Sequence, residues 1–85
     1  MKRAIVIGAS SGLGRQVAQL LIQEGWHVGL AARRVEVLNE LKNLAPDRIF
    51  TVKLDVSQSA SKATLHRLIN ELGGMNLFFY AAGIG

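Results

Sequence analysis

Three glycines near the N-terminus stand at a spacing that could hold a phosphate group. Gly8, Gly12 and Gly14 follow a short apolar run and open an amphipathic segment. Glycine lets the backbone turn sharply and lets a pyrophosphate approach without a Cβ in the way. The free N–H groups of the first helical turn would then face the phosphates, aided by the helix dipole. This placement predicts a dinucleotide site rather than a flexible linker.

The residues around these glycines distinguish between two kinds of phosphate loop. Ser10 and Ser11 can cap the helical turn or donate hydroxyl hydrogen bonds to phosphate. A P-loop requires Gly-Lys followed by Ser or Thr, whereas Gly14 is followed by Arg15 and Gln16. The segment is therefore not a P-loop.

Two arginines follow the second apolar run, about 20 residues beyond the glycines, where a Rossmann fold contacts the adenosine ribose. The sequence there is Ala31-Ala32-Arg33-Arg34, without the acidic residue that accepts hydrogen bonds from the ribose of NAD. A guanidinium offers a fork that suits the 2′-phosphate of NADP. We expect Arg33 to bind that phosphate. Arg34 either assists it or is a solvated residue that opens the next helix.

Short β-branched runs alternate with longer amphipathic segments along the chain. This alternation predicts an α/β fold, a Rossmann-type doubly wound parallel sheet in the spatial order third, second, first, fourth strand. The expected strands cover residues 3–7, 27–31, 49–54 and 75–82, and the expected helices cover 13–24, 35–44 and a third segment capped by Ser57 or Ser59. The expected core faces of the helices are Leu13, Val17, Leu20 and Leu21, then Val37, Leu38, Leu41 and Leu44, then Leu65, Leu68, Ile69 and Leu72.

The glycine segment, Gly-Ala-Ser-Ser-Gly-Leu-Gly with the spacing Gly-x-x-x-Gly-x-Gly, closely resembles the short-chain dehydrogenase/reductase family. The resemblance covers essentially the whole chain, 1–85, as the NADP-binding portion of such a domain. It implies an NADP-dependent oxidoreductase that transfers hydride between NADP(H) and a carbonyl or alcohol substrate. The family usually has Thr where this chain has Ile7, which removes one supporting hydroxyl.

The resemblance also implies cofactor contacts further along the chain. Asp55 and Val56 match the pair that holds the adenine ring, although Asp55 could instead cap the following turn. Tyr80-Ala81-Ala82-Gly83 stands where the family has Asn-Asn-Ala-Gly, so only the ribose contact with small residues is retained. The expected cofactor-binding residues are Gly8, Ser10, Ser11, Gly12, Leu13, Gly14, Arg33, Arg34, Asp55, Val56, Ala81, Ala82 and Gly83.

No catalytic residue is expected within the chain. The family uses a serine and a Tyr-x-x-x-Lys pair, and the residue four positions after Tyr80, the only tyrosine, is Ile84. The resemblance places the catalytic residues after Gly85, so the chain alone is expected to be inactive. Tyr80 is expected in the core. His27 and His66 have no ligand-spaced partner, so no metal site is expected, and Trp26 is expected to pack.

The composition of the chain excludes several kinds of site and partner. The 85 residues hold no cysteine, which excludes disulfides and thiol nucleophiles, and no apolar run approaches the roughly 20 residues of a membrane span. The net charge of +4 is scattered rather than clustered, so we expect no nucleic-acid partner. A cytoplasmic location is expected by default.

Two function classes remain open at this point. The first is the cofactor-binding part of an oxidoreductase, which is expected to be a homo-oligomer. The second is a non-catalytic dinucleotide-binding or sensor module, which a Tyr-x-x-x-Lys pair further along the reading frame would exclude. In either case the apolar strand at 75–82 is expected at an open sheet edge, where the fragment could self-associate.

Overall fold

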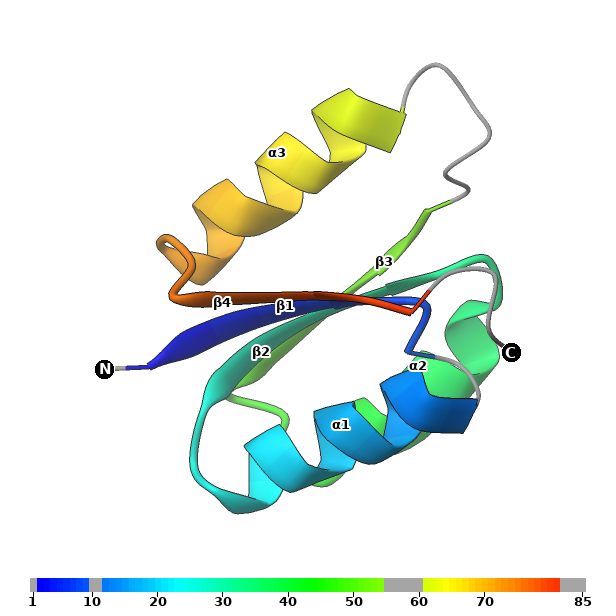
Figure 1. Ribbon diagram of the computed structural model, residues 1–85, viewed down its shortest axis with the longest axis vertical. Coiled ribbons are helices and arrows are strands. Elements are labelled where there is room, and N and C mark those ends of the chain that lie inside the picture. Colours follow the sequence, from blue (N-terminus) through cyan, green and yellow to red (C-terminus); the bar gives the residue numbers. More distant parts are fainter. Residues whose placement is uncertain (1, 10–11, 55–60, 82–85) are drawn as a thin grey trace.

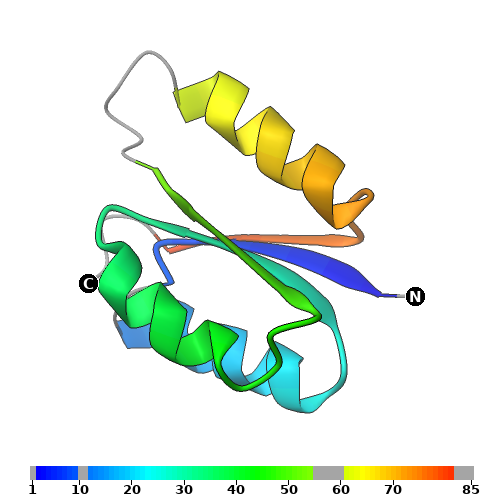
Figure 2. The same cartoon turned by 180° about the vertical axis from the view of Figure 1, so that it is seen from behind.

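The computed structural model describes residues 2–9, 12–54 and 61–81. Four parallel strands form one sheet in the order β3-β2-β1-β4, with helices on both of its faces (Figures 1 and 2). The elements are β1 (Arg3–Ile7), α1 (Gly12–Gln23), β2 (His27–Ala32), α2 (Val35–Lys42), β3 (Ile49–Lys53), α3 (Ser61–Leu72) and β4 (Leu77–Tyr80). The Rossmann-type fold and the strand order predicted from the sequence are confirmed.

Three elements are shorter than predicted, and of these β3 ends only one residue early, at Lys53. The second helix ends at Lys42 rather than Leu44, because the N–H groups of Leu44 and Ala45 bond to carbonyls three residues back and tighten the last turn. Strand β4 begins at Leu77, after Asn76 has donated its N–H to the Arg3 carbonyl. The expected caps at Ser57 and Ser59 lie outside the described residues.

The side chains of the sheet alternate between two apolar layers. In β1, Ala4 and Val6 face α1 and α2, whereas Ile5 and Ile7 face α3. The first layer adds Ala18, Leu21, Ile22, Leu38 and Leu41 from the two helices. The second layer adds Leu68 and Leu72 from α3. Helices α1 and α2 thus cover one face of the sheet, and α3 covers the other.

Helix α1 presents a different face to the core from the one expected. Leu13 and Leu20 are 47% and 58% exposed, so the prediction that both are core residues is wrong. The buried positions are Gly14, Ala18, Leu21 and Ile22. Small side chains at the first two of these let the helix lie close to the strands, which turns the leucine stripe outward. Leu44, also expected in the core, is 60% exposed beyond the end of α2.

Helix α3 approaches the sheet closely at Gly29 of β2. A Cβ at this position would lie 2.8 Å from Ile5 Cδ1 and 3.1 Å from Leu68 Cγ. Glycine in a strand costs backbone entropy, but here it makes room for the side chains of two other elements. The packing of α3 over β2 therefore depends on the missing side chain.

We expect Gly29→Ala to lower the free energy of unfolding by roughly 1–3 kcal/mol, because the methyl overpacks this layer. Urea denaturation followed by circular dichroism measures the change. Ile5→Val removes the nearest atom, so the same substitution in that background should cost less than it does alone. Additive effects of the two substitutions would contradict the steric explanation.

Candidate functional site

The glycine segment leaves β1 at the carboxyl edge of the sheet. Gly8 has a φ of 81°, and its N–H donates to the Ala31 carbonyl at 2.7 Å, so the chain turns across the end of β2. The N–H of Ala9 reaches the same carbonyl at 3.3 Å. Gly12, where α1 begins, has a φ of 57°. Both are left-handed conformations that favour glycine, which explains two of the three glycines.

Gly14 is required for a different reason. A Cβ on it would collide with the Gly8 carbonyl oxygen and would lie 3.0 Å from the Gly8 carbonyl carbon and 3.1 Å from the Ala81 Cβ. Ala81 itself is held at the end of β4 by its N–H, which donates to the Ile7 carbonyl at 2.8 Å. The first turn of α1, the end of β1 and the end of β4 therefore meet at one point.

Because the first turn of α1 meets the ends of β1 and β4, the N-terminus of this helix lies at the carboxyl edge of the sheet and is directed outward. The first turn of α1 contains no acidic residue. Its leading N–H groups lack helical partners, and the helix dipole favours an anion there. Leu13, expected to contact the cofactor, lies in this turn and is exposed. The geometry suits a phosphate group, because Gly12 and Gly14 have no Cβ and the first turn of α1 contains no carboxylate.

The end of β2 lies between the glycine segment and the end of β3. Ala31 accepts the hydrogen bond from Gly8, and Ala32 accepts one from the Leu54 N–H at 2.9 Å. Both alanines are buried, whereas the two arginines that follow are exposed. Arg33 therefore leaves the sheet beside the glycine segment, as the Rossmann arrangement requires.

The arginines of the chain fall into two groups. Arg3, Arg15 and Arg48 hold the fold together through hydrogen bonds to the Leu72 carbonyl, to Glu40 and to the carbonyls of Ile22 and Trp26, respectively. Arg67 of α3, and Arg33 and Arg34 at the end of β2, make no side-chain hydrogen bond or ion pair to any residue the structure describes. Arg34 serves as the N-cap residue of α2 through its extended backbone alone. The guanidinium groups of Arg33 and Arg34 are thus available to a ligand.

Ser10, Ser11, Asp55, Val56, Ala82 and Gly83 lie outside the described residues. Their roles remain predictions. The contacts that the structure does bring together are Gly8, Gly12, Leu13, Gly14 and Ala81 at one point, with Arg33 and Arg34 beside them.

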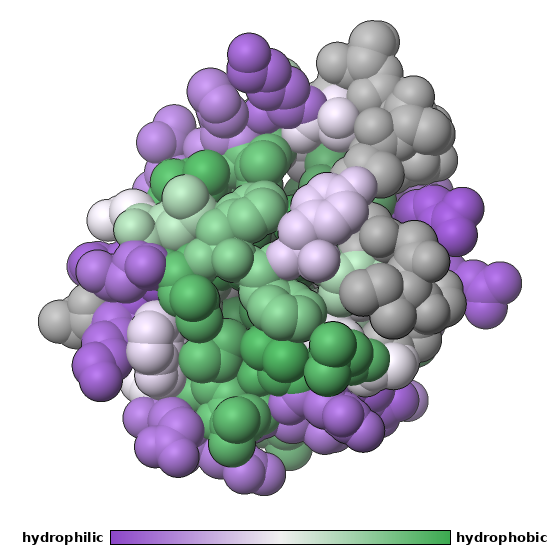
Figure 3. Space-filling model, viewed as in Figure 1, coloured by the Kyte–Doolittle hydropathy of each residue, from purple (hydrophilic) through white to green (hydrophobic). Residues whose placement is uncertain are grey.

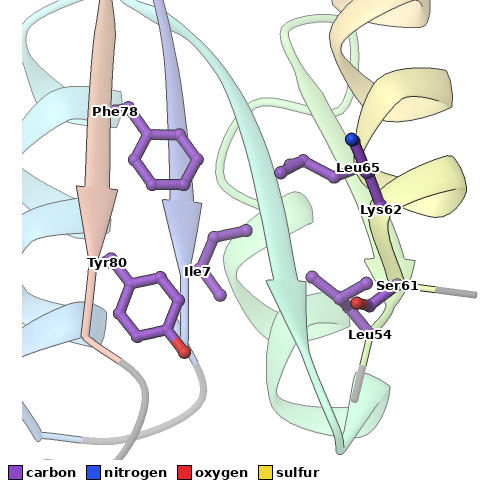
Figure 4. Close-up of a pocket in the computed structure, with 7 residues that line it drawn as sticks. All are labelled: Ile7, Leu54, Ser61, Lys62, Leu65, Phe78 and Tyr80. Carbon is purple, nitrogen blue, oxygen red and sulfur yellow. The ribbon is translucent and has the colours of Figure 1, made fainter. Parts of the chain in front are cut away.

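Tyr80 occupies a place that the sequence did not indicate. It was expected in the core, but its side chain is 51% exposed, so that prediction is wrong. Its ring lines a cavity of about 270 Å³ on the α3 face, together with Ile7, Leu54, Ser61, Lys62, Leu65 and Phe78 (Figure 4). Periodicity could not reveal this cavity, because its lining comes from strands and a helix that are distant in sequence.

The sequence predicted that Trp26 packs, and the structure confirms this prediction. Trp26 packs against the first apolar layer, with the Lys2 ammonium 5.5 Å from its ring centroid. Across the ranges 2–9, 12–54 and 61–81, no group of three His, Asp or Glu side chains could hold a metal ion. No helix among these residues is long and apolar enough to cross a membrane.

Comparisons with known proteins agree with this geometry. A family model describing short chain dehydrogenases matches residues 2–85. The chain belongs to the short-chain dehydrogenase family. An uncharacterized oxidoreductase of Myxococcus xanthus is 39% identical over 88 residues, and the match covers 99% of this chain and 35% of that protein. The glycine betaine reductase of Emericella nidulans is 37% identical over 87 residues, covering 98% of this chain and 7% of the reductase.

A solved structure agrees with the fold described above. The alcohol dehydrogenase of the archaeon Thermococcus sibiricus, complexed with 5-hydroxy-NADP, superposes with a TM-score of 0.82 at 29% identity. The match covers 92% of this chain and 35% of the dehydrogenase. The chain thus spans about a third of the length of the Myxococcus and Thermococcus proteins, and less of the Emericella reductase.

We expect Gly14→Ala to lower the free energy of unfolding by roughly 3 kcal/mol, at the upper end for overpacking, because its Cβ meets backbone atoms that cannot rotate away. In an unhindered helix the same change would stabilise by about 1 kcal/mol. Chemical denaturation shows whether the substitution lowers or raises the free energy of unfolding. Gln16→Ala, on the exposed side of α1, is the matched control and should change stability by less than about 0.5 kcal/mol. A more stable Gly14→Ala variant would contradict the close approach.

Proposed function

We propose that the chain is the NADP(H)-binding part of an oxidoreductase of the short-chain family. The activity would be hydride transfer between NADP(H) and a carbonyl or alcohol substrate. The observation that carries the cofactor preference is the Arg33 guanidinium at the end of β2, which has no partner among the described residues and stands where the sequence has no acidic residue. The NADP-type ligand of the Thermococcus dehydrogenase supports the same preference.

In this proposal the pyrophosphate lies against the first turn of α1. Gly14 lets that turn approach the strand ends, and Gly8 and Gly12 adopt the backbone conformations that open it. Ser10 and Ser11 would add hydroxyl donors. No protein side chain of this turn carries a negative charge that would repel the phosphates.

The adenosine half would extend toward the ends of β2 and β3. Arg33, assisted by Arg34, would pair with the 2′-phosphate through charge-assisted hydrogen bonds. Asp55 and Val56 would hold the adenine ring, and the small residues Ala81, Ala82 and Gly83 would lie against a ribose. The cofactor, when bound, supplies or accepts the hydride at its nicotinamide ring.

The chemistry on the substrate would need groups beyond these residues. The single tyrosine, Tyr80, is followed four positions later by Ile84, so it is not part of a Tyr-x-x-x-Lys pair. We therefore propose that the 85 residues bind the cofactor without turnover, and that the complete enzyme is a cytoplasmic homo-oligomer. Titration of the chain with NADPH is the direct test of the binding function.

We expect Arg33→Ala to weaken NADPH binding by at least tenfold, because one charge-assisted hydrogen bond contributes about 1.5–3 kcal/mol. Binding of NADH, which has no 2′-phosphate, should change less than twofold. Fluorescence titration of both cofactors measures the difference. Arg67→Ala, which removes an exposed arginine from α3, is the matched control for net charge. Equal affinities of the unsubstituted chain for NADPH and NADH would overturn the assigned preference.

A further inference from the structure

A lysine at the end of β3 lies next to the arginine pair at the end of β2. The two strands are hydrogen-bonded neighbours, and their register pairs Ala32 with Lys53. Arg33 follows Ala32 directly, so the main chains of Arg33 and Lys53 lie side by side where the two strands end. Figure 2 shows these strand ends and the start of α2 on the same side of the molecule. Hydrophilic side chains project from that side (Figure 3).

The side chain of Lys53 belongs to the face of the sheet that α1 and α2 cover. Ile49 of β3 is part of the first apolar layer, as Ala32 is, whereas Val52 packs on the α3 layer. Because side chains alternate along a strand, Lys53 shares the face of Ile49 and of its pair partner Ala32. The turn that carries the two arginines leads to α2, which packs on this same face. Lys53 and the arginine pair therefore lie at one corner of the sheet.

Lys53 has no partner among the residues that the structure describes. Its side chain is exposed, and it makes no hydrogen bond, ion pair or ring contact within residues 2–9, 12–54 and 61–81. Lys42, the other lysine beside β3, donates to the Ile49 carbonyl at 2.6 Å and lies 5.8 Å from the Phe50 ring centroid. Lys42 thus joins α2 to β3, whereas no described residue engages the ammonium group of Lys53.

Three positive charges without described partners thus stand at two adjacent strand ends. Like charges on neighbouring strands repel each other and lower the stability of the folded chain. Glu36 is the acidic residue in the first turn of α2, and no ion pair joins it to Arg33, Arg34 or Lys53 in the described part of the chain. An anion bound at this corner would remove the repulsion. The arrangement therefore favours a ligand group of high negative charge.

We propose that Lys53 is a further cation for the 2′-phosphate of NADP(H) and therefore determines cofactor specificity together with Arg33. The inference rests on the proposed function and extends it to a second strand. A phosphate monoester carries about two negative charges at neutral pH and offers three acceptor oxygens. These oxygens leave room for a lysine, which acts as a point charge, beside the fork of an arginine. NADH has a hydroxyl group in place of this phosphate and gains little from an added cation.

Fluorescence titration of Lys53→Gln with NADPH and with NADH tests the assignment. We expect the dissociation constant for NADPH to rise about three- to tenfold, as for a charge-assisted hydrogen bond weakened by solvent, and the constant for NADH to change less than about twofold. Lys53→Arg keeps the charge and should stay within about twofold of the unsubstituted chain for NADPH. Lys53→Glu adds a repulsive charge and should weaken NADPH binding more than Lys53→Gln does.

Lys62→Gln is the matched control. It removes the same charge from an exposed lysine of α3, on the opposite face of the sheet. Both dissociation constants should stay within about twofold of the unsubstituted chain. An equal loss of NADPH affinity in Lys53→Gln and Lys62→Gln would mean that the cofactor responds to overall charge, and it would refute a contact with Lys53.

Denaturation of the unliganded chain separates a binding role from a structural one. Because Lys53 has no described partner and lies beside two arginines, Lys53→Gln should leave the denaturant midpoint unchanged or raise it. NADPH should raise the Tm of the unsubstituted chain more than NADH does at the same concentration, and Lys53→Gln should narrow this difference. A lower midpoint with an unchanged cofactor preference would assign Lys53 a structural role and contradict the proposal.

The titrations also distinguish this inference from the proposed function. A chain that prefers NADPH, and that loses the preference in Arg33→Ala but not in Lys53→Gln, would exclude Lys53 and retain the proposed function. Equal weakening of NADPH and NADH binding by Lys53→Gln would also exclude it, because Lys53 would then serve a part that both cofactors share, such as the adenine ring expected near Asp55. Equal affinities of the unsubstituted chain for NADPH and NADH would overturn both.

Discussion

The close contact of α1 with the strand ends is the constraint on which the rest of this molecule depends. A Cβ on Gly14 would collide with backbone atoms of Gly8 and would lie against the Ala81 Cβ, so the helix N-terminus, β1 and β4 meet at one point. The same closeness continues one turn later at Ala18, which is fully buried. A helix seated this deeply places its unpaired N–H groups directly beyond the sheet, where an anion can reach them.

The positive charge at the candidate site comes from two arginines that have no partner among the described residues. Three arginines are engaged in hydrogen bonds that join helix ends, strands and the two helices of one layer. The two at the end of β2 emerge from a buried alanine pair into solvent, with no described partner. The order of the strands puts the end of β2 beside the end of β1. The guanidinium groups of Arg33 and Arg34 and the first N–H groups of α1 therefore lie at the same edge of the sheet.

Most of the fold could be predicted because its signals are local. β-branched runs such as Ile5-Val6-Ile7, closed by a glycine, indicate buried strands, and the intervening amphipathic segments indicate helices. Right-handed crossovers then leave few possible strand orders. Element ends were less predictable. The last turn of α2 closes through short-range hydrogen bonds that hydrophobic spacing does not report, so Leu44 continues the pattern without belonging to the helix.

The sequence by itself determined the spacing of the glycines and the absence of an acid beside Arg33 and Arg34, because these are properties of residue types. It also determined the alternation of strands and helices. Only the tertiary structure decided which apolar residues reach solvent. Leu13 and Leu20 continue the helical pattern, and Tyr80 continues an apolar strand, yet all three are exposed. Whether they are buried depends on which face of α1 meets the sheet and on what flanks β4 in space, and hydrophobic spacing reports neither.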